Sequence, residues 1–329
     1  DFLLDAYVSY DITNRIKVIF GQRSTYTDNR ELFMNSNSLQ LVERSRLTSA
    51  FSSIREFGLF LSGNFRLNGQ GSYLRPYFVL TNGDGINNFD KDLGGLKIGG
   101  RIDFLPFGLF TNKGQFRQID VMRELTPKFV IGVNYSHNSG MSSRRGRNSG
   151  SILYLDEFGQ QSLPDYTKYG IDFLFKYNGF SALGEYVKSS STVPTDIIER
   201  VRNDGSTSSS FLVNGVQDIE SYVNGRMMLG EAYNIQMGYL FKSGITIDSR
   251  YTHLKADDNS FLNNATFYNR PNYYTLGIGK LLGRNYGAKI QGSITFVDGS
   301  LGVNHDNDTA TDPVFKDELL FRLITTISF

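Results

Sequence analysis

The chain has 329 residues, of which 40% are hydrophobic and 14% aromatic, and its formal net charge is +1. It contains no Cys and no run of about 18 apolar residues, which excludes a disulfide framework and a membrane-spanning helix. Because the total charge is close to zero, any electrostatic preference must come from where the charges lie.

Apolar and polar side chains alternate with a period of two in many segments, which is typical of β-strands whose two faces meet different surroundings. We count about thirteen such segments of roughly nine to eleven residues, the length that a tilted strand needs to cross a hydrocarbon layer. The mean hydropathy of -0.29 agrees with apolar and polar positions offsetting each other in a barrel. In chain order the predicted strands are residues 2–10, 14–21, 55–65, 72–81, 95–105, 128–137, 168–177, 179–187, 231–241, 244–254, 272–282, 286–297 and 316–329.

The last predicted strand carries apolar side chains at every second position, and the sequence stops on an aromatic residue. These positions include Phe321, Leu323, Ile327 and Phe329. A terminal Phe with apolar partners in steps of two resembles the C-terminal signal that the outer-membrane insertion machinery reads. We therefore predict an all-β fold, with residues 1–329 forming a single antiparallel transmembrane β-barrel domain in the outer membrane of a Gram-negative bacterium.

Short and long connections alternate between the predicted strands, as in barrels with short inner turns and long outer loops. The predicted outer loops are residues 22–54, 82–94, 138–167, 188–230, 255–271 and 298–315. The inner connection 106–127 is unexpectedly long, so it contains either a small inner element or a misread strand. Because inner and outer connections alternate, the first predicted strand starts at the outer end of the barrel. We therefore expect an odd number of strands, and a signal peptide, to precede residue 1.

Several short motifs follow one another in a set order, namely Asp5–Tyr10, Gly21-Gln22, Glu43–Ser45, Arg55–Gly63, Asn82-Gly83 and Gly179–Tyr186. Together they resemble the phosphate-selective porin O and P family. The resemblance implies a trimeric channel of about sixteen strands, three of which would precede the thirteen visible here. The resemblance also makes phosphate-like oxyanions candidate solutes.

If the apolar face meets lipid, the opposite face lines water, and its charges decide what passes. The predicted inward basic residues outnumber the acids, and this excess would concentrate anions in a pore with low-dielectric walls. The alternative is that these charges pair across neighbouring strands and only brace the barrel. The basic set is Arg15, Lys17, Arg66, Arg75, Lys97, Arg101, Lys176, Arg250, Lys289 and Arg322, and the acids are Asp5, Glu56, Asp103, Asp172, Glu185 and Asp248.

Loop 22–54 is the predicted constriction, because it is too long for a simple hairpin and is rich in arginine. Guanidinium groups suit oxyanions through forked hydrogen bonds. The segment Ser38–Arg44 is expected to form a turn or two of helix. In the alternative interpretation the loop stays outside, and its arginines meet lipopolysaccharide phosphates. The arginines of the loop and its end are Arg23, Arg30, Arg44, Arg46 and Arg55.

Other candidate sites are weaker. Asp84, Asp90 and Asp92 could offer oxygen ligands to Ca²⁺, but they lack EF-hand spacing and a solvated loop is the better interpretation. The histidines, His137, His253 and His305, have no recognisable nucleophile motif near them. We therefore predict no catalytic residues, no metal and no cofactor, and we expect the basic run at 144–147 to contact surface polyanions rather than nucleic acid.

These patterns predict a porin through which small hydrophilic solutes, anions above all, diffuse passively. Its expected partners are outer-membrane lipid, lipopolysaccharide and, by family resemblance, two further copies of itself. The first alternative is a barrel that serves as a subunit or anchor of a larger outer-membrane assembly. The second is a soluble β-sandwich, which would bury the aromatic faces between two sheets.

Overall fold

A single antiparallel sheet of fourteen strands dominates the computed structural model. The structure describes residues 4–67, 71–87, 93–143, 152–202, 204–263, 270–283, 286–299 and 317–327. Strand β4 (Phe65–Arg66) continues β3 and pairs with β5, and the remaining strands follow each other in sequence order. These are β1 (Ala6–Thr13), β2 (Ile16–Ser24), β3 (Arg55–Gly63), β5 (Tyr73–Thr81), β6 (Lys97–Leu105), β7 (Lys128–Asn138), β9 (Asp165–Tyr177), β10 (Phe180–Thr192), β15 (Gly230–Leu240), β16 (Ile245–Ala256), β17 (Asn272–Leu281), β18 (Ala288–Asp298) and β19 (Glu318–Ile327).

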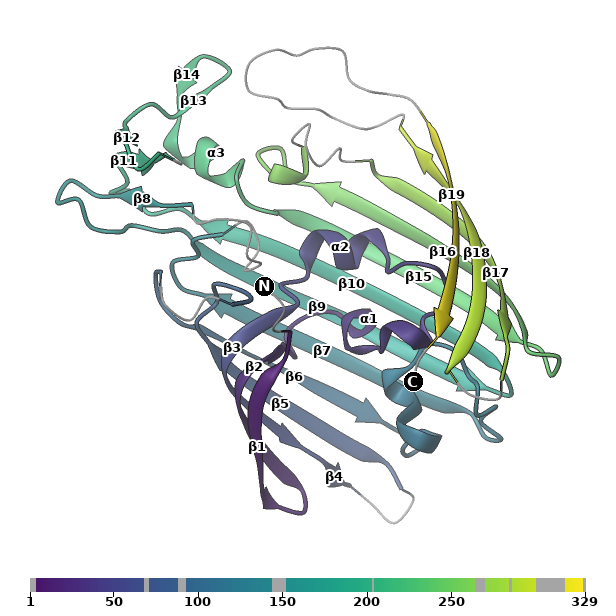
Figure 1. Cartoon of the computed structure of the whole chain (residues 1–329). Helices are drawn as coiled ribbons and strands as arrows, with labels where there is room; N and C mark the ends of the chain where they lie inside the picture. Colours follow the sequence, from purple (N-terminus) through teal and green to yellow (C-terminus); the bar gives the residue numbers. More distant parts are fainter. Residues whose placement is uncertain are drawn as a thin grey trace.

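Each predicted strand corresponds to one of these strands, so the prediction of an antiparallel β-barrel fold is confirmed. Figure 1 shows the sheet curled into a barrel wall, with β1 and β19 at its two edges. Among the described residues these edges do not pair with each other. No helix in the described part of the chain is long and apolar enough to cross a membrane.

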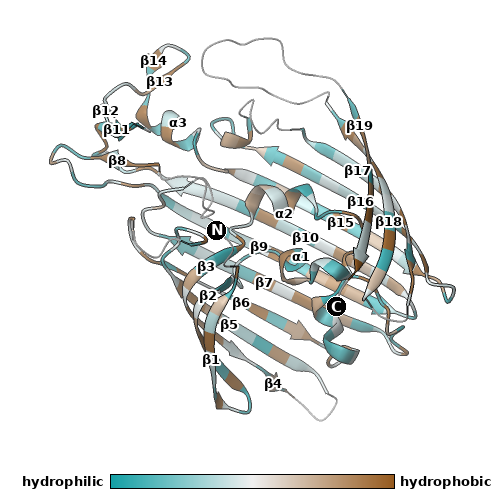
Figure 2. Ribbon diagram, in the orientation of Figure 1, coloured by the Kyte–Doolittle hydropathy of each residue, from teal (hydrophilic) through white to brown (hydrophobic). Residues whose placement is uncertain are grey.

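The hairpin of β9 and β10 illustrates how the sequence determines this wall. Asn178 and Gly179 both have positive φ, 48° and 92°, as a two-residue hairpin turn requires, and Tyr177 pairs with Phe180. Because side chains alternate, Leu174 is fully buried on the inner face whereas Phe173 is partly exposed on the outer face. The same alternation appears as bands along the strands in Figure 2.

The outer face of the wall is apolar and the inner face is polar. Charged inner side chains are buried in the interior, and this set includes Lys97, Arg101, Lys176, Lys289, Glu56, Asp103, Asp172, Glu185 and Asp248. Outer side chains such as Ile98, Ile171, Ile235, Ile247, Leu276, Phe321, Leu323 and Ile327 are exposed. This distribution is the reverse of a soluble β-sandwich, so the structure does not support the second alternative, in which the aromatic faces would be buried between two sheets.

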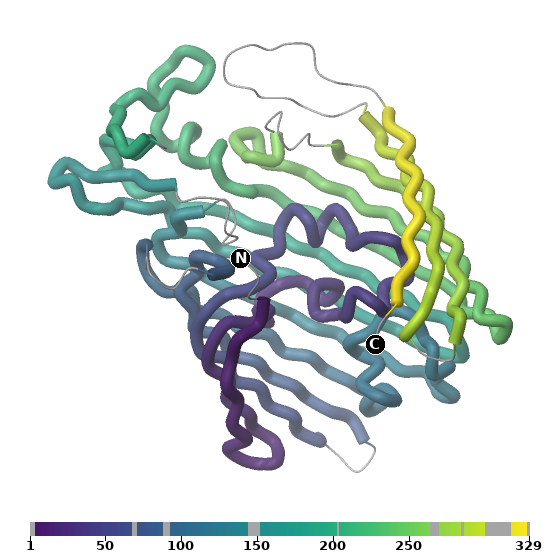
Figure 3. The backbone as a smooth tube through the Cα atoms, in the orientation of Figure 1, coloured from purple at the N-terminus to yellow at the C-terminus, as the bar shows by residue number. Residues whose placement is uncertain are grey.

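Loop 22–54 folds into the barrel rather than away from it. It carries α1 (Arg30–Phe33), the 3-10 turn η1 (Ser36–Ser38) and α2 (Arg46–Phe51), and it crosses in front of the concave face of the sheet (Figures 1 and 3). The predicted helix at 38–44 is wrong, because the carbonyl oxygens of Leu39 and Gln40 accept hydrogen bonds from β18 side chains instead. The helix begins later, where Oγ of Ser45 caps it by accepting from the backbone N–H of Thr48.

The long connection 106–127 is a second inward segment, and it holds a small element rather than a missed strand of the main sheet. Its 3-10 turn η2 (Thr111–Phe116) is followed by a stretch whose backbone bonds to loop 22–54, with the Ile119 N–H donating to the Ser38 carbonyl at 3.2 Å. Tyr286, from the turn before β18, donates from its hydroxyl to the Ile119 carbonyl at 2.6 Å. The two inward segments therefore support each other within the barrel.

The outer connections form a cap beyond the strand ends. It contains β8 (Tyr154–Leu155), β11 (Glu199–Val201), β12 (Thr207–Ser208), β13 (Leu212–Val213), β14 (Val216–Gln217) and α3 (Ile219–Asn224), and a further 3-10 turn, η3 (Phe261–Asn263), lies between β16 and β17. Loops 138–167 and 188–230 share a small apolar core, in which Tyr154, Phe211 and Tyr222 are buried together. The core joins parts of two long loops that the β9–β10 hairpin separates in sequence, and β8 and β11 of these loops lie side by side (Figure 1).

Candidate pore site

Arg30 of α1 occupies the centre of a buried ionic network against the barrel wall. Its Nε lies 2.7 Å from Oδ1 of Asp172 on β9, and its Nη2 lies 2.7 Å from Oδ1 of Asp103 on β6. Arg101 on β6 contacts both carboxylates too. Two guanidinium groups thus face two carboxylates, an arrangement that compensates charges which would otherwise be costly to bury.

Glu31 connects both inward segments to the wall. Its carboxylate accepts hydrogen bonds from the backbone N–H of Ser45 at 2.7 Å and from Oγ1 of Thr48 at 2.6 Å. It also accepts from Nε2 of Gln118, in the second inward segment, at 3.1 Å. Arg250 on β16 lies 3.7 Å away. Removing this one carboxylate would therefore leave donors from three parts of the molecule without their acceptor.

Asp28 anchors the start and the end of loop 22–54. Its carboxylate accepts from the backbone N–H of Ile54 at 2.8 Å, from Ser53, and from Nζ of Lys168 on β9. Burial by itself would raise the pKa of Asp28, but the positive charges of Lys168 and Lys97 outweigh burial and hold the pKa below its ordinary value of 3.8. The group is thus ionised throughout the neutral range.

Asp28→Asn is expected to destabilise the barrel at neutral pH, because Lys168 loses a charge-assisted bond of about 1.5–3 kcal/mol. A carboxyl whose pKa is lowered by folding contributes stability above its unfolded-state value, and that contribution disappears as the pH falls through the folded-state value. The stability gap between the natural chain and the variant should therefore persist down to pH 3.8 and close below it. Heat unfolding in detergent across this range measures the gap, with the exposed Asp258→Asn as control, and a gap already closed near pH 5 would contradict the assignment.

Several of the predicted inward-facing bases have bonding partners in the structure. Lys97 on β6 lies 2.5 Å from Glu56 on β3, two strands away across β5, and Lys289 donates to the Leu39 carbonyl at 2.7 Å. Other inner bases bond to inward-segment carbonyls or to an acid of loop 22–54, namely Lys176, Arg250 and Arg322. For these residues the bracing alternative describes what the structure shows.

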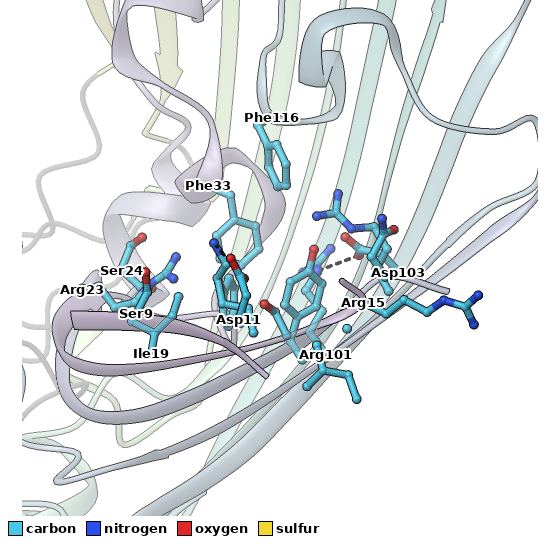
Figure 4. A pocket seen from close by; sticks show the side chains of 18 of the residues that line it. Ser9, Asp11, Arg15, Ile19, Arg23, Ser24, Phe33, Arg101, Asp103 and Phe116 are labelled. Carbon is cyan, nitrogen blue, oxygen red and sulfur yellow. Dashed lines mark hydrogen bonds and ion pairs between the residues drawn. The ribbon is translucent and has the colours of Figure 1, made fainter. Parts of the chain in front are cut away.

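A cavity of about 430 Å³ lies on the inner side of β1, β2, β3, β5 and β6, and we call it the first cavity. Figure 4 shows Phe33 and Phe116 reaching into it from the two inward segments. Its lining includes Arg23 and Arg75, both half-buried. Neither forms an ion pair with a carboxylate in the described part of the chain. The positive charges of Arg23 and Arg75 therefore face this space without a carboxylate that pairs with either of them.

A second cavity of about 750 Å³ is lined by Leu32 and Phe33 of α1, by the residues that follow them and by the end of loop 22–54. Its lining includes Arg44, whose Nη2 donates to the Met34 carbonyl at 2.7 Å and which forms no ion pair with a described carboxylate. Burial lowers the pKa of Arg44 from its ordinary value despite the attraction of Glu31. Arg55 also lines this cavity, but Asp5 neutralises it through two contacts of 3.1 and 3.2 Å.

Phe33 and Ser24 line both cavities. The Phe33 ring packs against Tyr26, with 6.1 Å between ring centroids, and under the Arg101 guanidinium, whose Cζ lies 5.0 Å from the ring centroid. The Phe33 ring thus borders both the first and the second cavity. Nothing in the alternation of strand residues signals this role, because Phe33 belongs to a loop that has no periodic pattern.

The other predicted site residues lie away from the two cavities or are paired. Lys17 lines the first cavity but lies 3.4 Å from Asp11, and the Arg46 guanidinium stacks over the Tyr273 ring at 5.9 Å. Asp84 accepts from the Leu93 N–H at 3.2 Å and from Ser142 at 2.9 Å, so it braces two outer loops. Outside the described residues lie Asp90, Asp92, His305, residues 144–147 and Phe329.

The remaining histidines take part in strand-to-strand bonds, with Nδ1 of His137 3.0 Å from Thr167 Oγ1 and Nδ1 of His253 2.9 Å from Asn272 Oδ1. Within the described ranges, no group of three or more His, Asp or Glu side chains could hold a metal ion.

No family model matches this sequence, and no curated protein does either, so membership of the phosphate-selective porin O and P family stays a prediction. Among solved structures, the chain is similar to the outer membrane protein OmpT of Vibrio cholerae in its trimer form, with 9% identity, 94% of this chain and 74% of that chain covered, and a TM-score of 0.42. It is also similar to OccAB3 of Acinetobacter baumannii, with 13% identity, coverages of 96% and 65%, and a TM-score of 0.41. An anion-selective porin from Comamonas acidovorans gives 8% identity, coverages of 95% and 70%, and a TM-score of 0.39.

Proposed function

We propose that this chain is an outer-membrane porin of a Gram-negative bacterium, through which small hydrophilic solutes diffuse passively with a preference for anions. The observation that carries the proposal is that three half-buried arginines, Arg23, Arg44 and Arg75, line the interior cavities and form no ion pair with a carboxylate in the described residues. In a space with low-dielectric walls, uncompensated positive charge raises the local concentration of anions. Phosphate-like oxyanions fit the forked donors of these side chains.

The distribution of the remaining charges supports the same function. Buried bases such as Lys97 and Arg101 are neutralised by Glu56, Asp103 and Asp172, so they contribute little net field to a passing ion. The unpaired arginines line two cavities that both border Phe33 of α1, and together they would form a basic path past this residue. The lipid and lipopolysaccharide contacts, and the homotrimer implied by the family resemblance, belong to the same proposal.

A second candidate is a barrel that serves as a subunit or anchor of a larger outer-membrane assembly. The inward segments favour it, because loop 22–54 and residues 106–127 cross the interior and bond to each other and to the wall. A lumen closed by these segments would pass no ions. Planar-bilayer recording separates the two functions, since a porin gives ohmic current steps and a closed scaffold gives none.

Arg44→Glu tests the anion preference, because it reverses the charge of a residue that lines the second cavity. We expect the reversal potential in a salt gradient to shift toward cation preference, since a charge at 4 Å contributes roughly 4 kcal/mol at an effective dielectric constant of about 20. Arg46→Glu is the matched control, because Arg46 stacks on Tyr273 and does not line either cavity. Equal shifts in both variants, or none in Arg44→Glu, would remove Arg44 from the ion path.

Leu276→Arg tests the lipid-facing wall. Leu276 lies in the middle of β17 and is 63% exposed, whereas Val216 on the cap hairpin is 66% exposed but lies outside the barrel sheet. An arginine facing the middle of a bilayer costs about 2–4 kcal/mol, so Leu276→Arg should fold poorly into lipid vesicles and Val216→Arg should fold normally. The folded fraction on unheated gels measures this difference, and equal folding of the two variants would argue against a lipid-facing wall.

A further inference from the structure

The first cavity combines unpaired arginines with aromatic rings. The Cζ atom of Arg23 lies 4.5 Å from the ring centroid of Tyr26, and that of Arg75 lies 5.1 Å from the ring centroid of Phe116. Tyr26 in turn lies 4.4 Å from the ring of Tyr77. Each guanidinium is therefore held against a ring face, which fixes its position without neutralising its charge.

The hydrogen-bonding capacity of these arginines is largely unused by the described residues. Among the described residues, Arg23 donates from Nε to the Ser24 carbonyl at 3.2 Å and from no other atom, and Nε of Arg75 is buried with no hydrogen-bond acceptor. An arginine has five N–H donors in a planar fork, and a carboxylate satisfies two of them at once. The lining thus offers donors that match a carboxylate group.

The rings make the cavity unlike a site for an inorganic anion. Phosphate would gain from the guanidinium groups but nothing from the faces and edges of Tyr26, Phe33, Tyr77 and Phe116. A ligand with a flat apolar ring would make favourable contacts with both the faces and the edges of these side chains, because aromatic pairs prefer stacked or edge-to-face contacts. The volume of about 430 Å³ also lies in the range of small-molecule sites.

We propose that the first cavity is a binding site for organic anions that carry a carboxylate on a flat aromatic ring, with Arg23 and Arg75 holding the carboxylate and Tyr26 and Phe116 contacting the ring. This inference rests on the proposed porin function, because it names the solute class that the basic path would select. It does not need the loops of the outer cap or the lipid-facing wall.

The test uses the full chain purified in detergent, with benzoate, acetate and inorganic phosphate as probes in calorimetric titrations. Benzoate should bind roughly tenfold more tightly than acetate, and more tightly than phosphate. Arg75→Met should weaken both carboxylates, whereas Tyr26→Leu should remove only the preference for benzoate. Tyr274→Leu, on the outer face of β17, is the matched control and should change nothing.

Benzoate binding no tighter than acetate, or undiminished benzoate binding by Arg75→Met, would overturn the assignment. Should Arg75→Met fail to fold, Tyr26→Leu and Phe116→Leu decide, because either must bring benzoate down to the level of acetate. Bilayer recordings separate this inference from the porin function. Anion-selective current without a preference for benzoate overturns only the site, while preferential benzoate binding without any current supports the site and overturns the channel.

Discussion

Arg30→Met is expected to release α1 from the barrel wall and to lower the free energy of unfolding by about 3–5 kcal/mol, because it breaks a buried ion pair from one side. Arg30 is only 1% exposed and bonds to both Asp103 and Asp172 at 2.7 Å. In the variant, Arg101 alone must compensate two buried carboxylates, and one negative charge remains uncompensated. The variant thus lacks the contacts by which Arg30 holds the segment against Asp103 and Asp172 in the natural chain.

Two measurements follow the loss of Arg30. The midpoint of heat unfolding in detergent should fall, and single-channel current should become larger and noisier as the inward segment leaves its position. Arg202→Met, at an exposed position in the outer cap, removes the same charge without breaking an ion pair and is the matched control. If Arg30→Met unfolds at the same temperature as this control, the network does not hold the inward segment.

Phe33→Ala is expected to join the first and second cavities and to raise single-channel conductance while anion preference is kept. The ring borders both spaces, and the arginines that face them are unchanged by its removal. Truncating a fully buried Phe costs about 3–5 kcal/mol, and Phe33 is only partly buried, so the barrel should lose less than that and remain folded.

Phe116→Ala is the matched control for this variant, because Phe116 lines the first cavity alone. Phe116→Ala should widen the first cavity without opening a passage to the second, and single-channel conductance should change little. Equal conductance in Phe33→Ala and the natural chain would mean that ions do not pass along α1. A rise in both variants would place the narrowest point elsewhere in the interior.

The barrel wall could be predicted from the sequence, because the pattern that indicates each strand lies within that strand. Alternate residues of a strand face opposite sides of the sheet. The apolar side chains of Leu319, Phe321 and Leu323 therefore indicate both the strand and which of its faces is apolar, without knowledge of the neighbouring strands. Short turns such as Asn178-Gly179 likewise depend on their own φ preferences. The inward-facing charges also followed from this alternation.

Only the tertiary structure decided which of those charges are paired and where the interior is narrow. Lys97 and Arg75 look alike in sequence, yet Lys97 meets Glu56 two strands away across the sheet, while Arg75 meets the Phe116 ring from a loop about forty residues away. The course of loop 22–54 depends on Asp28, Arg30 and Glu31 finding partners on β6, β9 and β16, and such long-range pairs have no local period. For this reason the sequence by itself determined the strands of the barrel wall and the alternation of their faces, whereas the tertiary structure determined the path of loop 22–54 and the charge pairs of the interior.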